Sequence, residues 1–365
     1  MIGIENKTTP LVDYFESLGF QAHLDSGKKR IKVFTSSKDE NRVLYEGVGV
    51  VDLSYLGIIE LKGKDVLDFL HRITTNDLKD LPKEGIRKTI FTTEKARIID
   101  LSTILNFEDF QLSIGGSENK SKVIGWIKKY VITDDVKVND ANGKYTLLEL
   151  VGPQADSFIT LVCGSVVNDL KPNTFRIIST DGMLFFLMKI LDENDNVRFR
   201  FLADVKNSQQ LLTFMLENKG IFDFAFIGED AYESYRIENS IAGSPNELND
   251  NYNPHEADIT KFVNFKKGCY IGQEVMARLE TYDKVQKKLV SIKFESDVDN
   301  NNSYNIIDSA GNEVGLVTSS ILSLRFNEYF GLAYIRRGSI ESGEELFARD
   351  KSGKSIRILL RNQKQ

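Results

Sequence analysis

Apolar positions in the first third of the chain change their spacing several times. Two short apolar runs, residues 48–53 and 58–61, flank a turn at residues 54–57, and this pattern predicts a β-hairpin. Over residues 66–73 the apolar side chains instead fall at positions i, i+3, i+4 and i+7. That spacing places them on one face of a helix.

Strands and helices then alternate through the middle of the chain. Strands are predicted at residues 88–92, 98–107, 145–151, 175–178, 184–191 and 197–202, and helices at residues 123–131, 208–216 and 229–241 and from Gly152 onward. Strand–helix–strand units with short links indicate an α+β fold of ferredoxin-like, split βαβ layers. The pattern occurs twice, so we expect two layered units of similar design.

The C-terminal part of the chain has a different pattern. Short strands are predicted at residues 289–294, 313–318, 331–335 and 356–360, and the turns between them are rich in Asn, Asp and Gly. This spacing is typical of a small all-β barrel. We therefore expect three domains, at residues 1–144, 145–284 and 285–365.

The composition of the chain excludes some classes of protein. The 365 residues include 53 acidic and 47 basic side chains, and a net charge of −6 argues against bulk attraction to a nucleic-acid backbone. DNA is therefore not an expected partner. The sequence has no apolar signal core at its start and no apolar run of about 20 residues, so we expect a cytoplasmic protein without a membrane span.

Cysteine and histidine are too scarce for several kinds of site. Two cysteines cannot form a disulfide framework or hold an iron–sulfur cluster alone, and three scattered histidines have no zinc-ligand spacing. No bound metal is therefore expected. The chemistry must come from a few side chains or from a bound cofactor.

The most informative segment is residues 267–274, which read KGCYIGQE and are called the KGCYIGQE loop below. Cys269 lies there between two glycines, after two lysines and before a helix predicted to begin near Gly272. Ammonium groups and a helix N-terminus lower the pKa of a thiol, so Cys269 is a candidate nucleophile or cluster-contacting group. The alternative is a partly buried, inert cysteine, which is what we expect of Cys163.

With the Ala277-Arg278 pair that follows it, the KGCYIGQE loop resembles the signature of the YgfZ-type folate-binding proteins. Residues 51–60, 75–78, 152–155, 236–238 and 315–319 resemble the wider aminomethyltransferase superfamily, which includes the T-protein of the glycine cleavage system. The resemblance implies a cloverleaf of two ferredoxin-like units and a β-barrel around a central, folate-sized hole. It also implies tetrahydrofolate or another folate derivative as the cofactor.

The resemblance to YgfZ-type proteins also implies a cellular role. YgfZ-type proteins are linked to the assembly or repair of iron–sulfur proteins, including enzymes that modify tRNA. This implies iron–sulfur client proteins as partners and Cys269 as the reactive group. A third, non-catalytic alternative is a folate-sensing scaffold that contacts tRNA.

Asp100 carries the alternative function, a tetrahydrofolate-dependent aminomethyl or other C1 transferase that resembles the T-protein. T-proteins place their catalytic aspartate in a Gly-Gly-x-x-Asp-Asp-Leu segment, whereas the matching stretch here, residues 96–101, has lost both glycines and one acid. The resemblance implies that Asp100 faces the pteridine ring as a catalytic, cofactor-binding carboxylate. The alternative is a solvent-exposed acid at a strand edge.

Two further residues are candidates for holding folate. The guanidinium group of Arg236 matches a folate carboxylate in two hydrogen bonds, although an ion pair with Glu233 three residues earlier would also explain it. Asn76 is placed to bind a pterin edge, and a polar turn after the preceding helix explains it about as well.

The KGCYIGQE loop and the helix after it supply the remaining expected contacts. These cofactor-binding candidates are Lys267, Tyr270, Gln273 and Arg278. Tyr270 would stack on a ring or fill the core, and Gln273 would touch the ligand or cap the helix.

Overall fold

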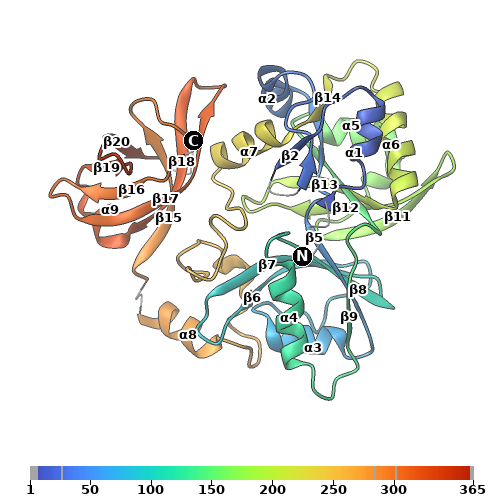
Figure 1. Ribbon diagram of the computed structural model, residues 1–365. Helices are drawn as coiled ribbons and strands as arrows, with labels where there is room; N and C mark the ends of the chain where they lie inside the picture. The colour runs from blue at the N-terminus through green and yellow to red at the C-terminus, as the bar shows by residue number, and fades with distance from the viewer. Residues whose placement is uncertain (1–6, 26–27, 283–284, 301, 362–365) are drawn as a thin grey trace, which may run out of the picture.

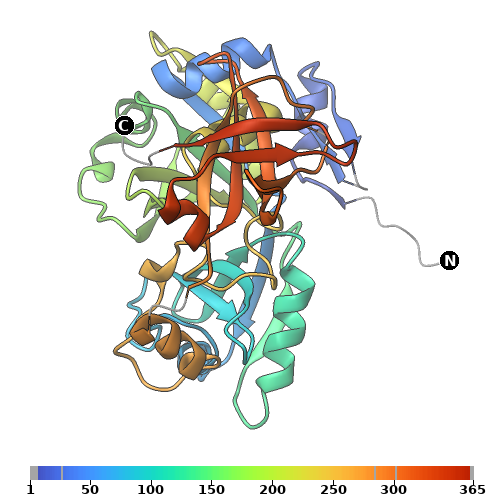
Figure 2. The ribbon, with the colours of Figure 1, turned by 90° about the vertical axis from the view of Figure 1, so that its left-hand side faces the viewer.

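The structure is a computed structural model that describes residues 7–25, 28–282, 285–300 and 302–361. It is a mixed α and β fold with two layered units and a separate closed barrel, as the sequence predicts (Figure 1). Turned by 90°, the barrel lies in front of one of the two layered units (Figure 2). Within the described residues, no helix has the length and apolar character that crossing a membrane requires.

The first layered unit is a five-stranded sheet covered by two helices. Its strands, in spatial order, are β6 (Ile86–Thr92), β7 (Ile98–Asn106), β8 (Phe110–Gly115), β5 (Gly57–Lys62) and β9 (Lys137–Asp140). The helices α3 (Val66–Ile73) and α4 (Lys120–Tyr130) pack on one face of this sheet. The apolar stripes that predict these helices are their buried faces, with Phe69 and Ile127 fully enclosed.

The second layered unit is a six-stranded sheet. Its strands, in spatial order, are β11 (Thr174–Thr180), β12 (Met183–Leu191), β13 (Val197–Ala203), β10 (Thr146–Val151), β4 (Val48–Asp52) and β14 (Phe224–Ile227). One face carries α1 (Val12–Ser17), α5 (Ala155–Cys163) and α6 (Val205–Glu217). The other face shares a core with the first sheet and with α2 (Ser37–Glu46) and α7 (Glu229–Glu238).

The hairpin predicted across residues 48–61 is wrong. β4 pairs with β10 and β14 in the second sheet, whereas β5 pairs with β8 and β9 in the first. Both strands are buried on both faces, so their continuous apolar runs do not reveal which partner each one takes. Residues 53–56 therefore cross from one layered unit to the other.

The N-terminal segment is more ordered than its polar sequence indicates. A small sheet of β1 (Lys7–Thr8), β3 (Lys28–Arg30) and β2 (His23–Asp25) precedes α2. Ser36 caps α2 by accepting a hydrogen bond from the Asp39 backbone N–H at 3.1 Å. Leu11 and Phe15 are buried in the core of the second unit, so this segment covers a sheet formed by residues far along the chain. The boundaries at residues 144 and 284 stay predictions.

The C-terminal barrel is confirmed as a closed six-stranded barrel. Its strands, in order around the barrel, are β15 (Lys287–Phe294), β18 (Glu328–Arg336), β17 (Glu313–Ser323), β16 (Asn305–Asp308), β19 (Leu346–Arg349) and β20 (Ser355–Leu360). The short strands β16 and β19 lack a clear sequence pattern. The barrel packs on the segment after α7, where the rings of Tyr252 and Tyr334 stack with centroids 3.4 Å apart.

Candidate functional site

A cavity of about 440 Å³ lies between the two layered units. Its wall comes from the N-terminal segment, the crossing at residues 51–56, β7, the end of β8, β13, α7 and the loop at residues 241–248. The barrel holds that loop in place, because the Tyr334 hydroxyl donates to the Glu247 carbonyl at 2.9 Å. A cavity of this size suits a cofactor-sized ligand.

Asp100 lies on β7 directly behind this wall and is only 2% exposed, which excludes a solvent-exposed acid. Its carboxylate accepts hydrogen bonds from the Ser102 hydroxyl at 2.6 Å, the Gly116 backbone N–H at 3.1 Å and the Asn119 amide at 3.2 Å. Burial raises the pKa of Asp100 to about 6, and these three donors limit the rise.

Two glycines separate Asp100 from the cavity. Gly115 and Gly116 line the wall, and a Cβ atom added at Gly115 would lie 1.8 Å from Oδ2 of Asp100. Glycine at position 115 is therefore what lets the carboxylate approach the cavity from behind.

Arg236 lines the cavity, but the protein itself uses all five of its N–H donors. Nε and Nη2 bind the Glu233 carboxylate, and Nη1 donates to the Ile241 carbonyl at 2.7 Å and to Glu247 at 2.9 Å. The last donor reaches Ser319 of the barrel at 3.2 Å. The ion pair with Glu233 named as the alternative is present, and a folate carboxylate would have to displace one of these partners.

Asn76 is bound locally rather than at the cavity wall. Its amide donates to the Lys88 carbonyl at 2.8 Å, and its side-chain oxygen accepts from the Asp77 backbone N–H at 2.8 Å. These contacts form the turn that follows α3.

Lys267 is buried and fastens the KGCYIGQE loop to the end of α3. Its ammonium group donates to three backbone carbonyls, those of His71, Thr74 (2.6 Å) and Asn76 (2.7 Å). Burial lowers the pKa of Lys267 to about 7, and nearby Asp77 opposes this. Carbonyl groups at a helix C-terminus are natural partners of a cation.

Cys269 is exposed on this loop, and it does not line the cavity. Tyr270 beside it is buried in the core, and its hydroxyl has no partner among the described residues. After Gly272 the chain enters α8 (Gln273–Tyr282), the predicted helix. Gln273 is half-buried at its first position, and the exposed Arg278 pairs with Glu274 at 2.5 Å.

The structure thus divides the predicted site residues between two places. Arg236 lines the cavity, and Asp100 lies behind the part of its wall formed by Gly115 and Gly116. The others, Asn76, Lys267, Cys269, Tyr270, Gln273 and Arg278, lie on or beside the KGCYIGQE loop at the end of α3.

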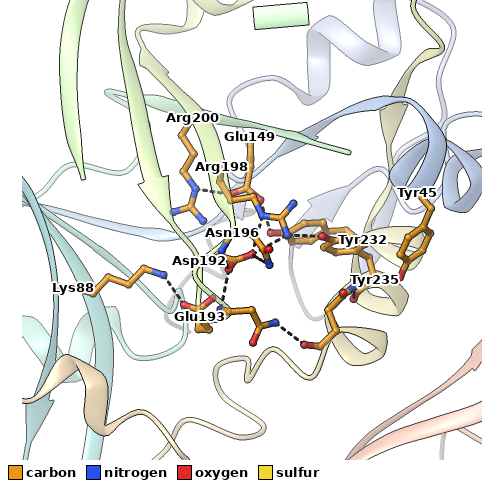
Figure 3. Close-up of polar contacts among 12 residues, drawn as sticks. Tyr45, Lys88, Glu149, Asp192, Glu193, Asn196, Arg198, Arg200, Tyr232 and Tyr235 are labelled. Atoms are coloured by element: carbon orange, nitrogen blue, oxygen red, sulfur yellow. Dashed lines mark hydrogen bonds and ion pairs between the residues drawn. The ribbon is translucent and has the colours of Figure 1, made fainter. Parts of the chain in front are cut away.

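A cluster of buried charges beside the cavity is missing from the sequence prediction (Figure 3). Its ion pairs are Lys88–Glu193 at 2.7 Å, Arg200–Glu149 at 2.5 Å and Arg198–Asp192 at 2.9 Å. The sequence does contain a signal, because Arg198 and Arg200 alternate with apolar residues along β13 and so point to one face. That face is the one turned toward the first layered unit.

The N-terminal segment adds a second group of polar residues to the wall. The guanidinium of Arg30 lies over the Tyr55 ring, 4.0 Å from its centroid, and pairs with Glu229. Asp52 accepts from the Ser54 backbone N–H at 2.9 Å, and burial raises its pKa. Nε of Arg30 has no partner among the described residues.

Comparison with known proteins shows the family of this chain. The GCVT N-terminal domain matches residues 10–267, and the glycine cleavage T-protein C-terminal barrel domain matches residues 287–360. The chain belongs to the GCVT family. The aminomethyltransferase superfamily inferred from sequence is thereby confirmed, whereas the finer YgfZ assignment stays a prediction.

Relatives of this GCVT-family protein cover nearly its whole length. It is 24% identical to an aminomethyltransferase of Staphylococcus carnosus, over 98% of both chains. It is 26% identical to a chloroplastic protein of Arabidopsis thaliana named as a transferase, over 91% of this chain and 75% of that one. The crystal structure of glycine cleavage system aminomethyltransferase T from Bartonella henselae has the same fold, with a TM-score of 0.85, 20% identity and coverage of 98% and 97%.

Proposed function

We propose that this GCVT-family protein binds a reduced folate of the tetrahydrofolate class in the cavity between its two layered units. The cavity has the volume of a cofactor site, and Tyr55 and Tyr232 in its wall offer aromatic surface to a ring. Arg200 in the same wall, whose terminal nitrogens have no partner among the described residues, supports a ligand that carries hydrogen-bond acceptors. The residues present therefore fit the cofactor.

We propose further that the protein is of YgfZ type and supports the assembly or repair of iron–sulfur proteins. The observation that carries this is the place of Cys269, which is exposed on a loop that Lys267 fastens to the end of α3 and lies outside the cavity wall. A thiol in that place is accessible to a partner protein but does not face a ligand in the cavity. One cysteine cannot hold a cluster alone, so the client protein would supply the other ligands.

A second candidate is transfer of an aminomethyl or other C1 group, and the names of the relatives favour it. A reduced folate supplies the nitrogen atoms that carry the C1 unit. The chain would supply Asp100, because a carboxyl group with a pKa of about 6 exchanges a proton near neutral pH. Asp100 would act at the cavity only if the wall formed by Gly115 and Gly116 let the ligand reach it.

Two measurements test these proposals. Calorimetric titration with tetrahydrofolate tests the cavity, and saturable binding is expected; its absence would refute the folate proposal. The activities of iron–sulfur enzymes in cells that carry Cys269→Ala test the thiol, and we expect them to fall. Cys163→Ala is the matched control, since burial raises the pKa of that thiol to about 12.

The transferase candidate makes the opposite prediction. Under it, tetrahydrofolate-dependent turnover of an aminomethyl donor would be measurable, would collapse in Asp100→Asn and would be unchanged in Cys269→Ala. Normal iron–sulfur enzyme activities in the Cys269→Ala cells, together with such turnover, would decide for the transferase.

A further inference from the structure

The cations of the cavity wall differ in how many of their hydrogen-bond donors the protein uses. Among the described residues, four cations line the cavity: Arg30, Lys88, Arg200 and Arg236. Arg236 has all five donors in use, and Lys88 pairs with Glu193. Arg30 binds Glu229 through Nη1 and lies over the Tyr55 ring, and its Nε, which has no partner among the described residues, is enclosed by the protein. Arg200 uses only Nε, so its two terminal nitrogens lack a partner among the described residues.

Arg200 is held in a fixed orientation at the cavity wall. It lies on β13 directly opposite Glu149 on β10, and Nε donates to Oε2 of Glu149 at 2.5 Å. The other oxygen of Glu149 accepts from the Tyr232 hydroxyl at 3.0 Å, so each carboxylate oxygen has a partner (Figure 3). The terminal nitrogens of Arg200 are not enclosed by the protein, and at the cavity wall they are consequently the part left for a ligand.

The charges of the wall indicate what kind of ligand group Arg200 meets. Five carboxylates stand among the described lining residues: Asp52, Glu118, Glu193, Glu229 and Glu233. They at least balance the four cations, even where one of them is protonated by burial. A site without surplus positive charge does not favour a dianion, whereas it accepts an uncharged ring that offers carbonyl or ring-nitrogen acceptors.

We propose that Arg200 is the specificity-determining residue of the cavity, whose two terminal nitrogens donate to the acceptor edge of an uncharged pterin ring. The inference rests on the proposed folate binding and deepens it. The dianionic glutamate tail then lies beyond the charged wall. Arg200 thus takes the place of Arg236 as the arginine at the ligand, but it binds the ring and not a carboxylate.

Calorimetry with three probes tests this inference on the full-length protein. The probes are tetrahydrofolate, 6-methyltetrahydropterin as the ring without the tail, and p-aminobenzoylglutamate as the tail without the ring. We expect the first two to bind and the third not to bind. Arg200→Lys, which keeps a cation for Glu149 but loses the planar fork, should weaken both binders by about 10- to 100-fold.

Arg176→Lys, at an exposed arginine on β11 of the same sheet, is the matched control and should leave both affinities unchanged. Circular dichroism of Arg200→Lys checks that the fold is kept. Unchanged affinity of Arg200→Lys, or binding of the tail fragment but not the ring, would overturn this inference alone. Failure of the unchanged protein to bind tetrahydrofolate would refute the proposed function and this inference with it.

Discussion

Burial in the fold controls the ionisation of Asp100. A carboxyl group whose pKa is raised in the folded state binds protons more tightly there than in the unfolded chain. Its contribution to stability is therefore complete below about pH 4 and is lost as the pH rises through about 6.

The first prediction follows from that sign. When the pH rises from 4.5 to 7, the unfolding free energy of the unchanged protein should fall by about 2 kcal/mol more than that of Asp100→Asn. Urea unfolding at both pH values measures the difference. Identical changes in the two proteins would show that the carboxyl group titrates normally.

The second prediction concerns the glycine that gives Asp100 its space. Gly115→Ala should destabilise the protein by about 1–3 kcal/mol, because its methyl group would overlap the carboxylate oxygen. Gly125→Ala is the control: it lies in α4 with no atom within 4 Å of the added Cβ, and it should gain up to about 1 kcal/mol. Equal effects of the two substitutions in thermal unfolding would contradict the close approach at Gly115.

Among the structural elements, the KGCYIGQE loop depends on contacts at both of its ends. Lys267 binds the carbonyls after α3, and the Thr92 hydroxyl donates to the Ile271 carbonyl at 2.9 Å. Gly272, with a φ of +85°, brings the backbone close to the Thr93 carbonyl, where a Cβ would lie only 2.7 Å from that oxygen. Cys269 is thus exposed on a segment that is fixed on either side of it.

The third prediction tests this attachment. Lys267→Met leaves three carbonyls without their donor and should lower the unfolding free energy by about 1–3 kcal/mol. Chymotrypsin should then cleave near Phe265 and Tyr270 at least several times faster. Lys266→Met, at the exposed neighbour, should change neither quantity, and equal cleavage of the two variants would argue against the attachment.

The sequence predicts elements better than it predicts their partners. The stripe in α3 and the barrel strand β20 are visible because burial of one face dictates their residues. The assignment of β4 and β5 to different sheets is not visible, because a strand buried on both faces shows no alternation. α2 is missed because most of its residues are polar, and its buried Glu40 accepts from the backbone N–H of Gly228, a contact that no local pattern contains.

For the candidate site, too, the sequence predicts residues better than it predicts their partners. Asp100 and Arg236 can be singled out from sequence, but their partners come from distant segments such as Asn119 and Ser319. Residue type indicates that a guanidinium binds carboxylates, and only the assembled structure shows which carboxylates it has already bound. That is why Arg200 emerges from the structure and not from the sequence.

For the whole molecule, Arg236 joins α7, the loop at residues 241–248 and the barrel. Its partner Glu247 is completely buried and also accepts a hydrogen bond from the Ser319 hydroxyl at 2.7 Å. Removing the guanidinium would leave that carboxylate uncompensated in the interface.

The fourth prediction is that Arg236→Met costs about 3–5 kcal/mol and uncouples the barrel. Fluorescence of Trp126, the sole tryptophan, reports the first layered unit, and circular dichroism reports the whole chain. The two unfolding transitions should separate in this variant, whereas Arg236→Met with Glu247→Gln should regain part of the loss. Coincident transitions in Arg236→Met would contradict the joining role.

The strand crossing at residues 53–56 has a consequence for how the protein is made. β4 leaves the ribosome long before β14, its neighbour in the sheet, which begins at Phe224. At about 5–20 residues per second that delay lasts roughly 10–30 s. The other neighbour of β4, β10 (Thr146–Val151), follows after roughly 5–20 s, and until then the apolar strand has no sheet to join. A nascent chain of this protein therefore needs shelter for its first strands, from a chaperone or from the ribosome surface, until the middle of the chain has been synthesised.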